Sequence, residues 1–102
     1  MGSGGVIVPP DTYYEKIQVV LKKYDILLVA DEVITAFGRT GNMFGTTTMK
    51  LVPDMIVCAK GLSSAYLPIS ALMINERVFK EMSEKSDEIG VFGLTFTYLS
   101  LI

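Results

Sequence analysis

Apolar positions along the chain fall into short unbroken runs and into segments of helical period. The unbroken runs cover residues 26–30, 55–59 and 69–74, and their length is typical of strands. Runs without polar positions are typical of strands that are covered on both faces of a parallel sheet. Residues 13–23 instead repeat apolar side chains at helical spacing, as does the segment that follows Asn75. The alternation of strands and helices predicts an α/β fold.

Residues at the ends of the helical segments predict how the helices begin. Thr12 and Glu15 have the spacing of a capping box, in which a hydroxyl and a carboxylate each accept from a free backbone N–H. Asn75 is placed to cap the second helix with its side chain. On the exposed side of that helix, Glu81 and Lys85 have the spacing of an ion pair.

Two further segments complete the pattern. Residues 6–8 form another short apolar run, which predicts a strand that Pro9 ends. Residues 37–45 contain three glycines, which predict a loop.

Composition excludes several kinds of site. The chain has no histidine and one cysteine, so a Ser-His-Asp triad, a histidine-ligated metal site, a zinc ribbon and an internal disulfide are all excluded. We therefore expect no metal. The net charge is -2 and no basic cluster is present, which argues against nucleic acid as a partner. Acid–base chemistry would fall to lysine, aspartate, glutamate or tyrosine.

The size of the chain fits one small domain, but its mean hydropathy is higher than expected for such a domain. The 102 residues make one domain at most, and a compact domain of this mass would expose roughly 5,700 Å². No stretch approaches the ~20 apolar residues of a membrane span, and no targeting segment is recognisable at the start of the chain. The mean hydropathy of +0.44 is nevertheless high. We expect some apolar faces to need cover from a partner or from further parts of a larger fold.

Two charged residues directly follow buried runs. Asp31 ends the first run and Lys60 follows the second. In open parallel sheets, ligands bind at the carboxyl ends of the strands, so the two side chains are expected at one edge. An amine against apolar walls loses its proton more readily and can attack a carbonyl, which is the requirement for a Schiff base.

An acid beside a heterocyclic nitrogen would complete the same chemistry. A carboxylate about 4 Å from a pyridinium contributes roughly 4 kcal/mol at an effective dielectric of ~20. That energy keeps the nitrogen protonated, so the ring can accept electrons. Pyridoxal phosphate requires both a lysine for its aldehyde and an acid for its ring nitrogen.

Each of these residues also has a structural interpretation. Asp31 could cap the next helix, and Lys60 could point to solvent. The segment 38–41 could be an anion-binding nest or an ordinary turn. Glu32 is expected to be structural or to support the site, and Cys58 to be inert core.

Several motifs in order resemble the class III aminotransferases, also called omega-transaminases. The resemblance rests on Asp31-Glu32-Val33, on the run 37–41, on Pro53-Asp54 and on Ala59-Lys60-Gly61, with 29 positions between Asp31 and Lys60. The run 60–69 is most similar to the pyruvate-using gamma-aminobutyrate transaminases. The resemblance extends from Gly2 to about Thr97.

The resemblance implies a role for four residues. Asp31 would pair with the pyridinium nitrogen of pyridoxal 5'-phosphate, and Val33 would pack against its ring. Lys60 would be the catalytic residue, forming the Schiff base and then moving the proton between substrate and cofactor. Thr97 would bind the cofactor phosphate of the neighbouring subunit, although the residues around it depart from the family pattern.

The resemblance also implies a fold and a reaction. The fold would be the fold-type I large domain, a mainly parallel sheet with flanking helices, of which residues 1–102 would be a single segment truncated at both ends. The reaction would transfer an amino group from an omega-amino donor, such as gamma-aminobutyrate, to a keto acid, such as pyruvate, in a mitochondrial or cytoplasmic homodimer.

Two alternatives remain open at this point. The chain could be a catalytically inactive remnant that associates with full-length transaminase subunits or has no function. It could also be an unrelated small α/β binding module. If the chain is instead the central segment of a transaminase, we expect this chain alone to be inactive or nearly so.

Overall fold

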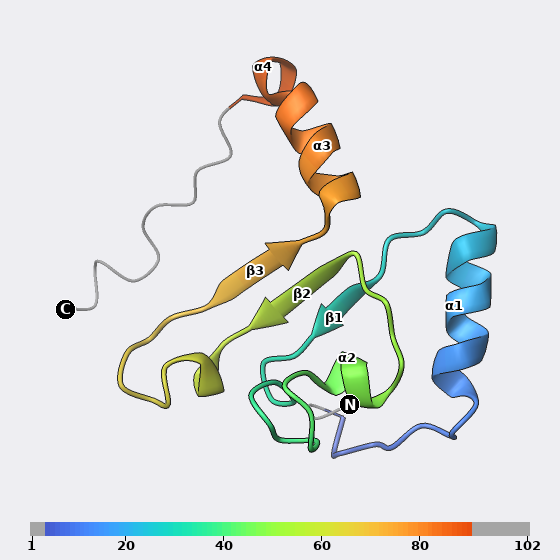
Figure 1. Cartoon of the computed structure of the whole chain (residues 1–102), viewed down its shortest axis with the longest axis vertical. Coiled ribbons are helices and arrows are strands. Elements are labelled where there is room, and N and C mark those ends of the chain that lie inside the picture. The colour runs from blue at the N-terminus through green and yellow to red at the C-terminus, as the bar shows by residue number, and fades with distance from the viewer. Residues whose placement is uncertain (1–3, 91–102) are drawn as a thin grey trace.

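A sheet of three short strands forms the centre of the structure, a computed structural model that describes residues 4–90 (Figure 1). Only two of the eight elements, α1 and α3, are longer than four residues, so much of the described chain is loop. The elements in chain order are α1 (Tyr13–Lys23), β1 (Val29–Asp31), α2 (Gly45–Thr48), β2 (Met55–Cys58), a 3-10 turn η1 (Lys60–Leu62), β3 (Ala71–Ile74), α3 (Glu76–Glu84) and α4 (Ser86–Ile89).

The sheet has the order β1-β2-β3 and is mixed. β1 and β2 are parallel, with Asp31 opposite Val57, whereas β2 and β3 are antiparallel. The expectation of a mainly parallel sheet therefore holds for only one of the two strand pairs in the described residues. The reversal arises between β2 and β3, where Lys60, Ser64 and Ala65 adopt positive φ angles and turn the chain back (Figure 1). The alternation of helices and strands in the described residues is consistent with the α/β class.

Helix α1 has the predicted bounds, but the hydrogen bonds at its N-terminus differ from those predicted. Thr12 makes no side-chain capping bond, so the predicted capping box is wrong. A backbone bond of 2.9 Å from the Tyr13 N–H to the Pro10 carbonyl closes the turn before the helix instead. Gln18 then joins the helix to the loop before β2, since its side chain donates to the Lys50 carbonyl at 3.2 Å and accepts from the Val52 N–H at 3.0 Å.

The predicted strand over residues 6–8 is also wrong. These residues lie outside the sheet, in which the edge strand β1 pairs only with β2. Val6 has a φ of 59°, which is incompatible with a regular strand. An apolar run forms a strand only where a neighbouring ladder accepts its backbone groups.

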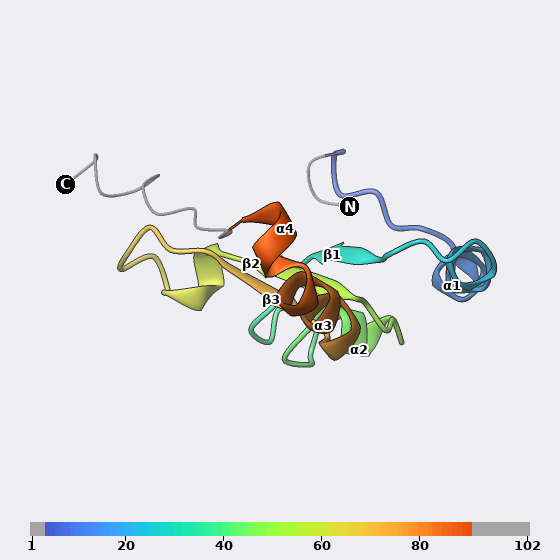
Figure 2. The ribbon, with the colours of Figure 1, turned by 90° about the horizontal axis from the view of Figure 1, so that it is seen from above.

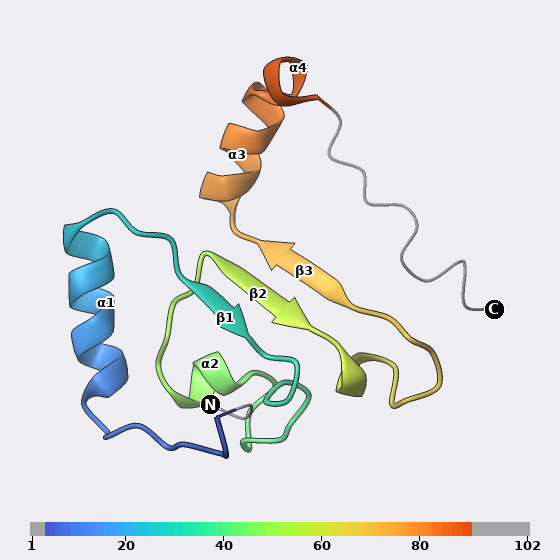
Figure 3. The same cartoon turned by 180° about the vertical axis from the view of Figure 1, so that it is seen from behind.

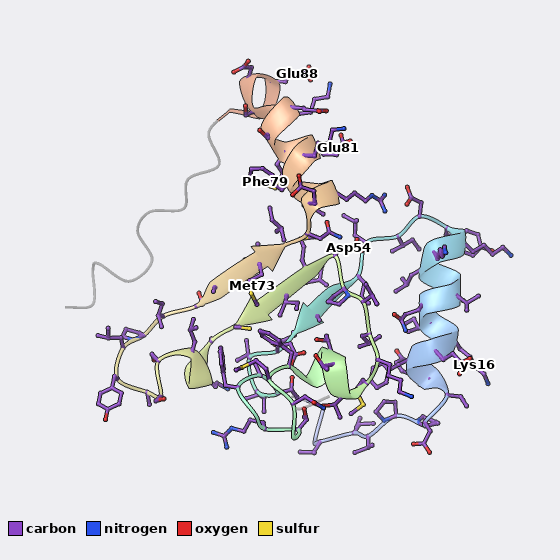
Figure 4. The ribbon with its side chains drawn as sticks, viewed as in Figure 1. Lys16, Asp54, Met73, Phe79, Glu81 and Glu88 are labelled. Atoms are coloured by element: carbon purple, nitrogen blue, oxygen red, sulfur yellow. The ribbon has the colours of Figure 1, made fainter. Side chains whose placement is uncertain are left out.

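Asp54 joins three elements at the start of β2 (Figure 4). Its carboxylate accepts from the Leu28 N–H at 2.8 Å and from the Asn75 side-chain amide at 2.9 Å. Asn75 in turn caps α3, because its side-chain oxygen accepts from the Val78 N–H at 3.0 Å. The predicted N-cap is confirmed, and these bonds fix the end of the sheet opposite the candidate site.

The predicted pair between Glu81 and Lys85 does not form. Lys85 pairs instead with Glu88 at 3.2 Å, and Lys80 pairs with Glu84 at 3.8 Å. Both pairs are exposed, where ion pairs contribute little to stability.

The chain forms an open arrangement with a small core. Its accessible surface is 8348 Å², well above the value expected for a compact domain, and among residues 4–90 the buried apolar residues are Ala36 and Cys58. Figure 2 shows α1 beside the sheet rather than on either face, and Figure 3 shows α3 continuing past the end of β3. The first apolar run is therefore not covered on both faces, and half of the Val29 surface is exposed.

Many large apolar side chains are exposed in the described residues. Met73 on β3 and Phe79 on α3 are two examples (Figure 4). The helical spacing of apolar residues after Asn75 predicts that Phe79 faces inward, so its exposure is a further departure from the predicted packing. The apolar surplus inferred from hydropathy is confirmed in the described residues. Among them, no helix has the length and apolar character needed to cross a membrane.

Candidate active site

The carboxyl ends of β1 and β2 lie at one edge of the sheet (Figure 1). Asp31 is the last residue of β1 and stands opposite Val57, and Lys60 follows three residues after Val57. The Glu32 N–H donates to the Val57 carbonyl at 2.8 Å, which holds the two chain segments together where the strands end. The two residues singled out from the sequence thus leave the sheet at the same edge, as predicted.

Lys60 has an unusual backbone conformation for a lysine. Ala59 before it is fully extended, and Lys60 itself has a φ of 47°, in the left-handed region. Non-glycine residues in this region cost of order 1–3 kcal/mol and are concentrated at functional sites. The Lys60 side chain is exposed rather than buried against apolar walls, so the environment that the sequence predicted for its amine is absent in the described residues.

Gly61 allows the loop over residues 37–44 to approach Lys60. A Cβ atom at position 61 would lie 3.0 Å from Cδ2 of the Phe37 ring. Phe37 is held in this loop by a short bond from its N–H to the Met43 carbonyl and by a tilted contact with the ring of Phe44. The ring of Phe37 therefore lies against the backbone directly after the candidate lysine.

Two hollows flank Lys60. The smaller has a volume of about 250 Å³, and the larger is an open groove of about 1020 Å³. Lys60, Gly61 and Arg39 line both of them, and Val33 lines the smaller one. The structure thus brings Lys60 and Val33 to one hollow. Asp31 lies at the same edge of the sheet but is not one of the lining residues.

Asp31 caps a turn and not the helix that its structural interpretation predicts, because residues 33–40 form turns. One carboxylate oxygen accepts from the Val33 N–H at 3.0 Å, and the side chain is exposed. This bond fixes the direction of the carboxylate relative to Val33. The second oxygen has no hydrogen-bond partner within residues 4–90, so it is available to a ligand.

Glu32 is the most completely bonded side chain at this edge and is only 2% exposed. One of its oxygens accepts from the Gly45 N–H at 2.9 Å and from the Thr35 hydroxyl, and the other accepts from the Thr46 N–H at 2.6 Å. A Cβ at position 45 would lie 3.0 Å from the first oxygen, so glycine at this position makes the approach possible.

The charge of Glu32 is stabilised by these bonds. Burial raises the pKa of the Glu32 carboxyl, but the hydrogen bonds from Thr35, Thr46 and Gly45 together outweigh burial, and the net pKa lies below its ordinary value. These bonds agree with the expectation that Glu32 is structural or supports the site. Sequence alone did not identify its partners, because they lie up to 14 positions further along the chain.

Cys58, the last residue of β2, is 1% exposed. Burial first, and the charge of Glu32 second, raise the pKa of its thiol. A raised pKa keeps the thiol protonated and unreactive at neutral pH, which agrees with the expectation of an inert core residue.

The remaining sequence candidates are placed as follows. In the segment 38–41, the Gly41 N–H donates to the Gly38 carbonyl at 3.1 Å, so the segment is a turn and does not form an open nest. Thr97 lies outside the described residues. Within residues 4–90, no three metal-ligating side chains are gathered closely enough to hold a metal ion.

This edge of the sheet defines a class of site: an amine after one strand, a carboxylate after the neighbouring parallel strand and a hollow beside them. The model of the aminotransferase class-III family matches residues 1–98. The chain belongs to the class III aminotransferase family, whose members use pyridoxal phosphate.

Individual proteins show the same similarity. The chain is 53% identical over 98 residues to the mitochondrial gamma-aminobutyrate transaminase 1 of Oryza sativa subsp. indica, covering 96% of this chain and 19% of that protein. A solved transaminase structure with L-alanine is 62% identical, with a TM-score of 0.88 over 95% of this chain and 23% of that one. The omega-transaminase of Pseudomonas jessenii, solved in complex with PMP, is 57% identical, with a TM-score of 0.88 over 95% of this chain and 21% of that one. The chain thus spans about a fifth of the length of these relatives.

Proposed function

We propose that this chain carries the cofactor-reactive segment of a pyridoxal-phosphate-dependent aminotransferase. The observation that carries the proposal is the position of Lys60, which follows β2 with a left-handed backbone and lines a hollow together with Val33. The carboxylate of Asp31 ends the neighbouring parallel strand.

The chemistry of these groups fits pyridoxal phosphate. The cofactor, when bound, supplies an aldehyde that takes up the amino group and a ring that accepts electrons from the substrate. Lys60 offers an exposed primary amine for the aldehyde, and later holds and moves a proton at its Nζ. Asp31 offers one unbonded carboxylate oxygen for a ring nitrogen. Val33 offers an apolar surface on the wall of the hollow.

The hydrogen bond from the Val33 N–H to the Asp31 carboxylate supports the proposed roles of these two residues. The same turn that directs the Asp31 carboxylate also fixes the backbone of Val33. A ring that contacts the Val33 side chain would therefore meet a carboxylate whose direction is already set. Preorganised charge of this kind needs no reorientation when the ring nitrogen becomes protonated.

The substrates and the assembly are proposed from the family. The amino donor would be an omega-amino compound such as gamma-aminobutyrate and the acceptor a keto acid such as pyruvate. The name of the rice relative supports this donor class and a mitochondrial location. We further propose a homodimer in which Thr97 binds the cofactor phosphate of the neighbouring subunit. The many exposed apolar side chains support cover by a second subunit or by further parts of the fold.

We propose that residues 1–102 form one segment of the large domain and that this segment alone does not turn over substrate. Two observations support this: the chain spans about a fifth of its relatives, and its apolar surface lacks cover within the described residues. The function therefore has to be tested with the remaining four fifths present.

A chimera provides this test. The segment of the Pseudomonas jessenii omega-transaminase that aligns with this chain is replaced by this chain, and alanine formation is measured from pyruvate and an amine that the parent enzyme accepts. We expect the chimera to form alanine with pyridoxal phosphate present, because the backbones superpose closely. The parent enzyme is the control. A chimera that folds like the parent but forms no alanine would contradict the proposed function.

A further inference from the structure

Two bulky residues with left-handed backbones lie next to each other at the candidate site. Phe37 has a φ of 61° and Lys60 has a φ of 47°. Such angles are outliers for bulky side chains and persist only where the surrounding structure fixes them. The ring of Phe37 lies against Gly61, the residue that directly follows Lys60. The two outliers are therefore joined through a single glycine.

Gly61 provides space for the ring of Phe37. Unlike Gly38 and Gly41, it is not in the left-handed region, so its backbone conformation does not require a glycine. A Cβ at position 61 would lie 3.0 Å from Cδ2, 3.6 Å from Cβ and 3.7 Å from Cγ of Phe37. The three nearest atoms thus all belong to one side chain, and an alanine would have to displace the ring or its own backbone.

Phe37 is itself fixed by its own loop. Its N–H donates to the Met43 carbonyl at 2.6 Å, and its ring centroid lies 6.4 Å from that of Phe44. Ala36 before it is 3% exposed, and the Ala36 N–H donates to the Glu32 carbonyl at 3.1 Å. Because these contacts fix the ring from its own side, the ring can constrain the chain that follows β2.

The hydrogen bonds after β2 do not explain the backbone of Lys60. The Leu62 N–H donates to the Ala59 carbonyl at 3.1 Å, and the Ser63 N–H donates to the Lys60 carbonyl at 3.3 Å. These bonds close the 3-10 turn η1, and a 3-10 turn ordinarily has negative φ angles. The left-handed φ of Lys60 therefore requires a contact from outside the turn.

We propose that Phe37 is a positioning residue for Lys60: its ring holds Gly61 in place and keeps Lys60 in the conformation in which it lines a hollow with Val33. A change of φ at Lys60 would rotate Gly61 about the N–Cα bond of Lys60, and the ring opposes this rotation. The proposal rests on the proposed function, since the direction of the Lys60 amine matters for its reaction with the cofactor aldehyde.

The backbone of Lys60 is measured first, by NMR on the full chain without cofactor. A positive φ gives a strong NOE between the amide and α protons of the same residue, and a negative φ gives a weak one. We expect a strong NOE at Lys60 in the unchanged chain and a weak one in F37A, because an unconstrained lysine leaves the left-handed region. G61A, which displaces the ring without removing it, should have the same effect. F37Y keeps the ring edge against Gly61 and should keep the strong NOE.

Pyridoxal phosphate followed by borohydride measures the consequence for the amine. The Lys60 Nζ forms a C–N bond with the aldehyde carbon, the carbonyl oxygen leaves as water, and borohydride donates a hydride to the C=N bond. Peptide mass spectrometry gives the modified fraction at Lys60 and at the other six lysines. We expect F37A to lower the modification of Lys60 by about tenfold, the change in population that corresponds to backbone strain of this order. The small aldehyde glycolaldehyde, which does not need the hollow, should modify Lys60 equally in both proteins.

Two variants control these measurements. F79A removes another exposed phenylalanine, on α3 and away from the loop over residues 37–44 (Figure 4), and should change neither the NOE nor the modification. F37A/G61A should behave like F37A alone, because the added Cβ no longer meets a ring. Circular dichroism spectra verify that each variant is folded like the unchanged chain.

Three outcomes would overturn the inference: a strong Lys60 NOE that persists in F37A and G61A, a weak NOE in F37A with unchanged modification by pyridoxal phosphate, or an equal loss with glycolaldehyde. If pyridoxal phosphate does not select Lys60 even in the unchanged chain, the proposed function fails. The NOEs of F37A, G61A and F37Y then decide by themselves whether Phe37 holds the Lys60 backbone.

Discussion

The change of Lys60 to arginine is expected to abolish amino transfer by the chimera. Arginine keeps the positive charge, but its guanidinium stays protonated and cannot attack the aldehyde of the cofactor or return a proton to the substrate. The loss of the proton transfer alone corresponds to about 10²–10⁴-fold. Alanine formation by the K60R chimera should therefore fall at least a thousandfold.

The matched control is K16R. Lys16 is exposed on α1, away from the sheet edge (Figure 4), and the same chemical change there should leave alanine formation unaltered. Because Lys60 is itself exposed, K60R should unfold at the same denaturant concentration as the unchanged chimera. If K60R retains more than a tenth of the activity, Lys60 is not the reactive amine.

The change of Glu32 to glutamine is expected to give the largest loss of stability. The amide group of glutamine has one accepting oxygen in place of two, so at least one of the buried N–H groups of Gly45 and Thr46 loses its acceptor. An unsatisfied buried donor costs about 1–3 kcal/mol. Urea unfolding of E32Q should show a decrease of this size, and amide exchange should accelerate first at Gly45 and Thr46.

The effect of Glu32 should also depend on pH. The folded-state pKa lies below the ordinary value of 4.5, so the stabilisation is present above pH 4.5 and is lost as the pH falls through the lowered folded-state pKa. The difference in unfolding free energy between the unchanged chain and E32Q should therefore be full at pH 7 and shrink below pH 4.5. The control is E81Q, at an exposed position on α3 without an ion pair in the described residues (Figure 4). An equal difference at pH 7 and pH 3 would show that the Glu32 charge is not stabilised by these bonds.

The positions of the candidate residues could be predicted from the sequence because each depends on one local feature. An apolar run that stops at Asp31 and another that stops before Lys60 are sufficient to place both at strand ends. Parallel pairing of β1 and β2 then brings the two ends together. The cap at Asn75 is local in the same way, since a helix start needs only a short polar side chain at one position.

Features that depend on distant residues could not be predicted. β3 is antiparallel because Ser64 and Ala65 take positive φ angles, and neither residue type signals that conformation in a sequence. The contacts of Glu32 depend on Gly45, 13 positions away. Arg39 gave only an ambiguous turn signal, because the hollow it shares with Lys60 is formed by segments that are distant in the sequence. The exposure of the strands could not be predicted, because unbroken apolar runs indicate strands that are covered on both faces. The described residues do not cover both faces of these strands.

The most direct measurement is to mix the purified chain with pyridoxal phosphate, reduce it with borohydride and locate the pyridoxyl group by peptide mass spectrometry. The other six lysines are internal controls. If the edge of the sheet after β1 and β2 already forms part of a cofactor site, the pyridoxyl group will be found selectively on Lys60. Uniform modification of all seven lysines, or none, would contradict the account.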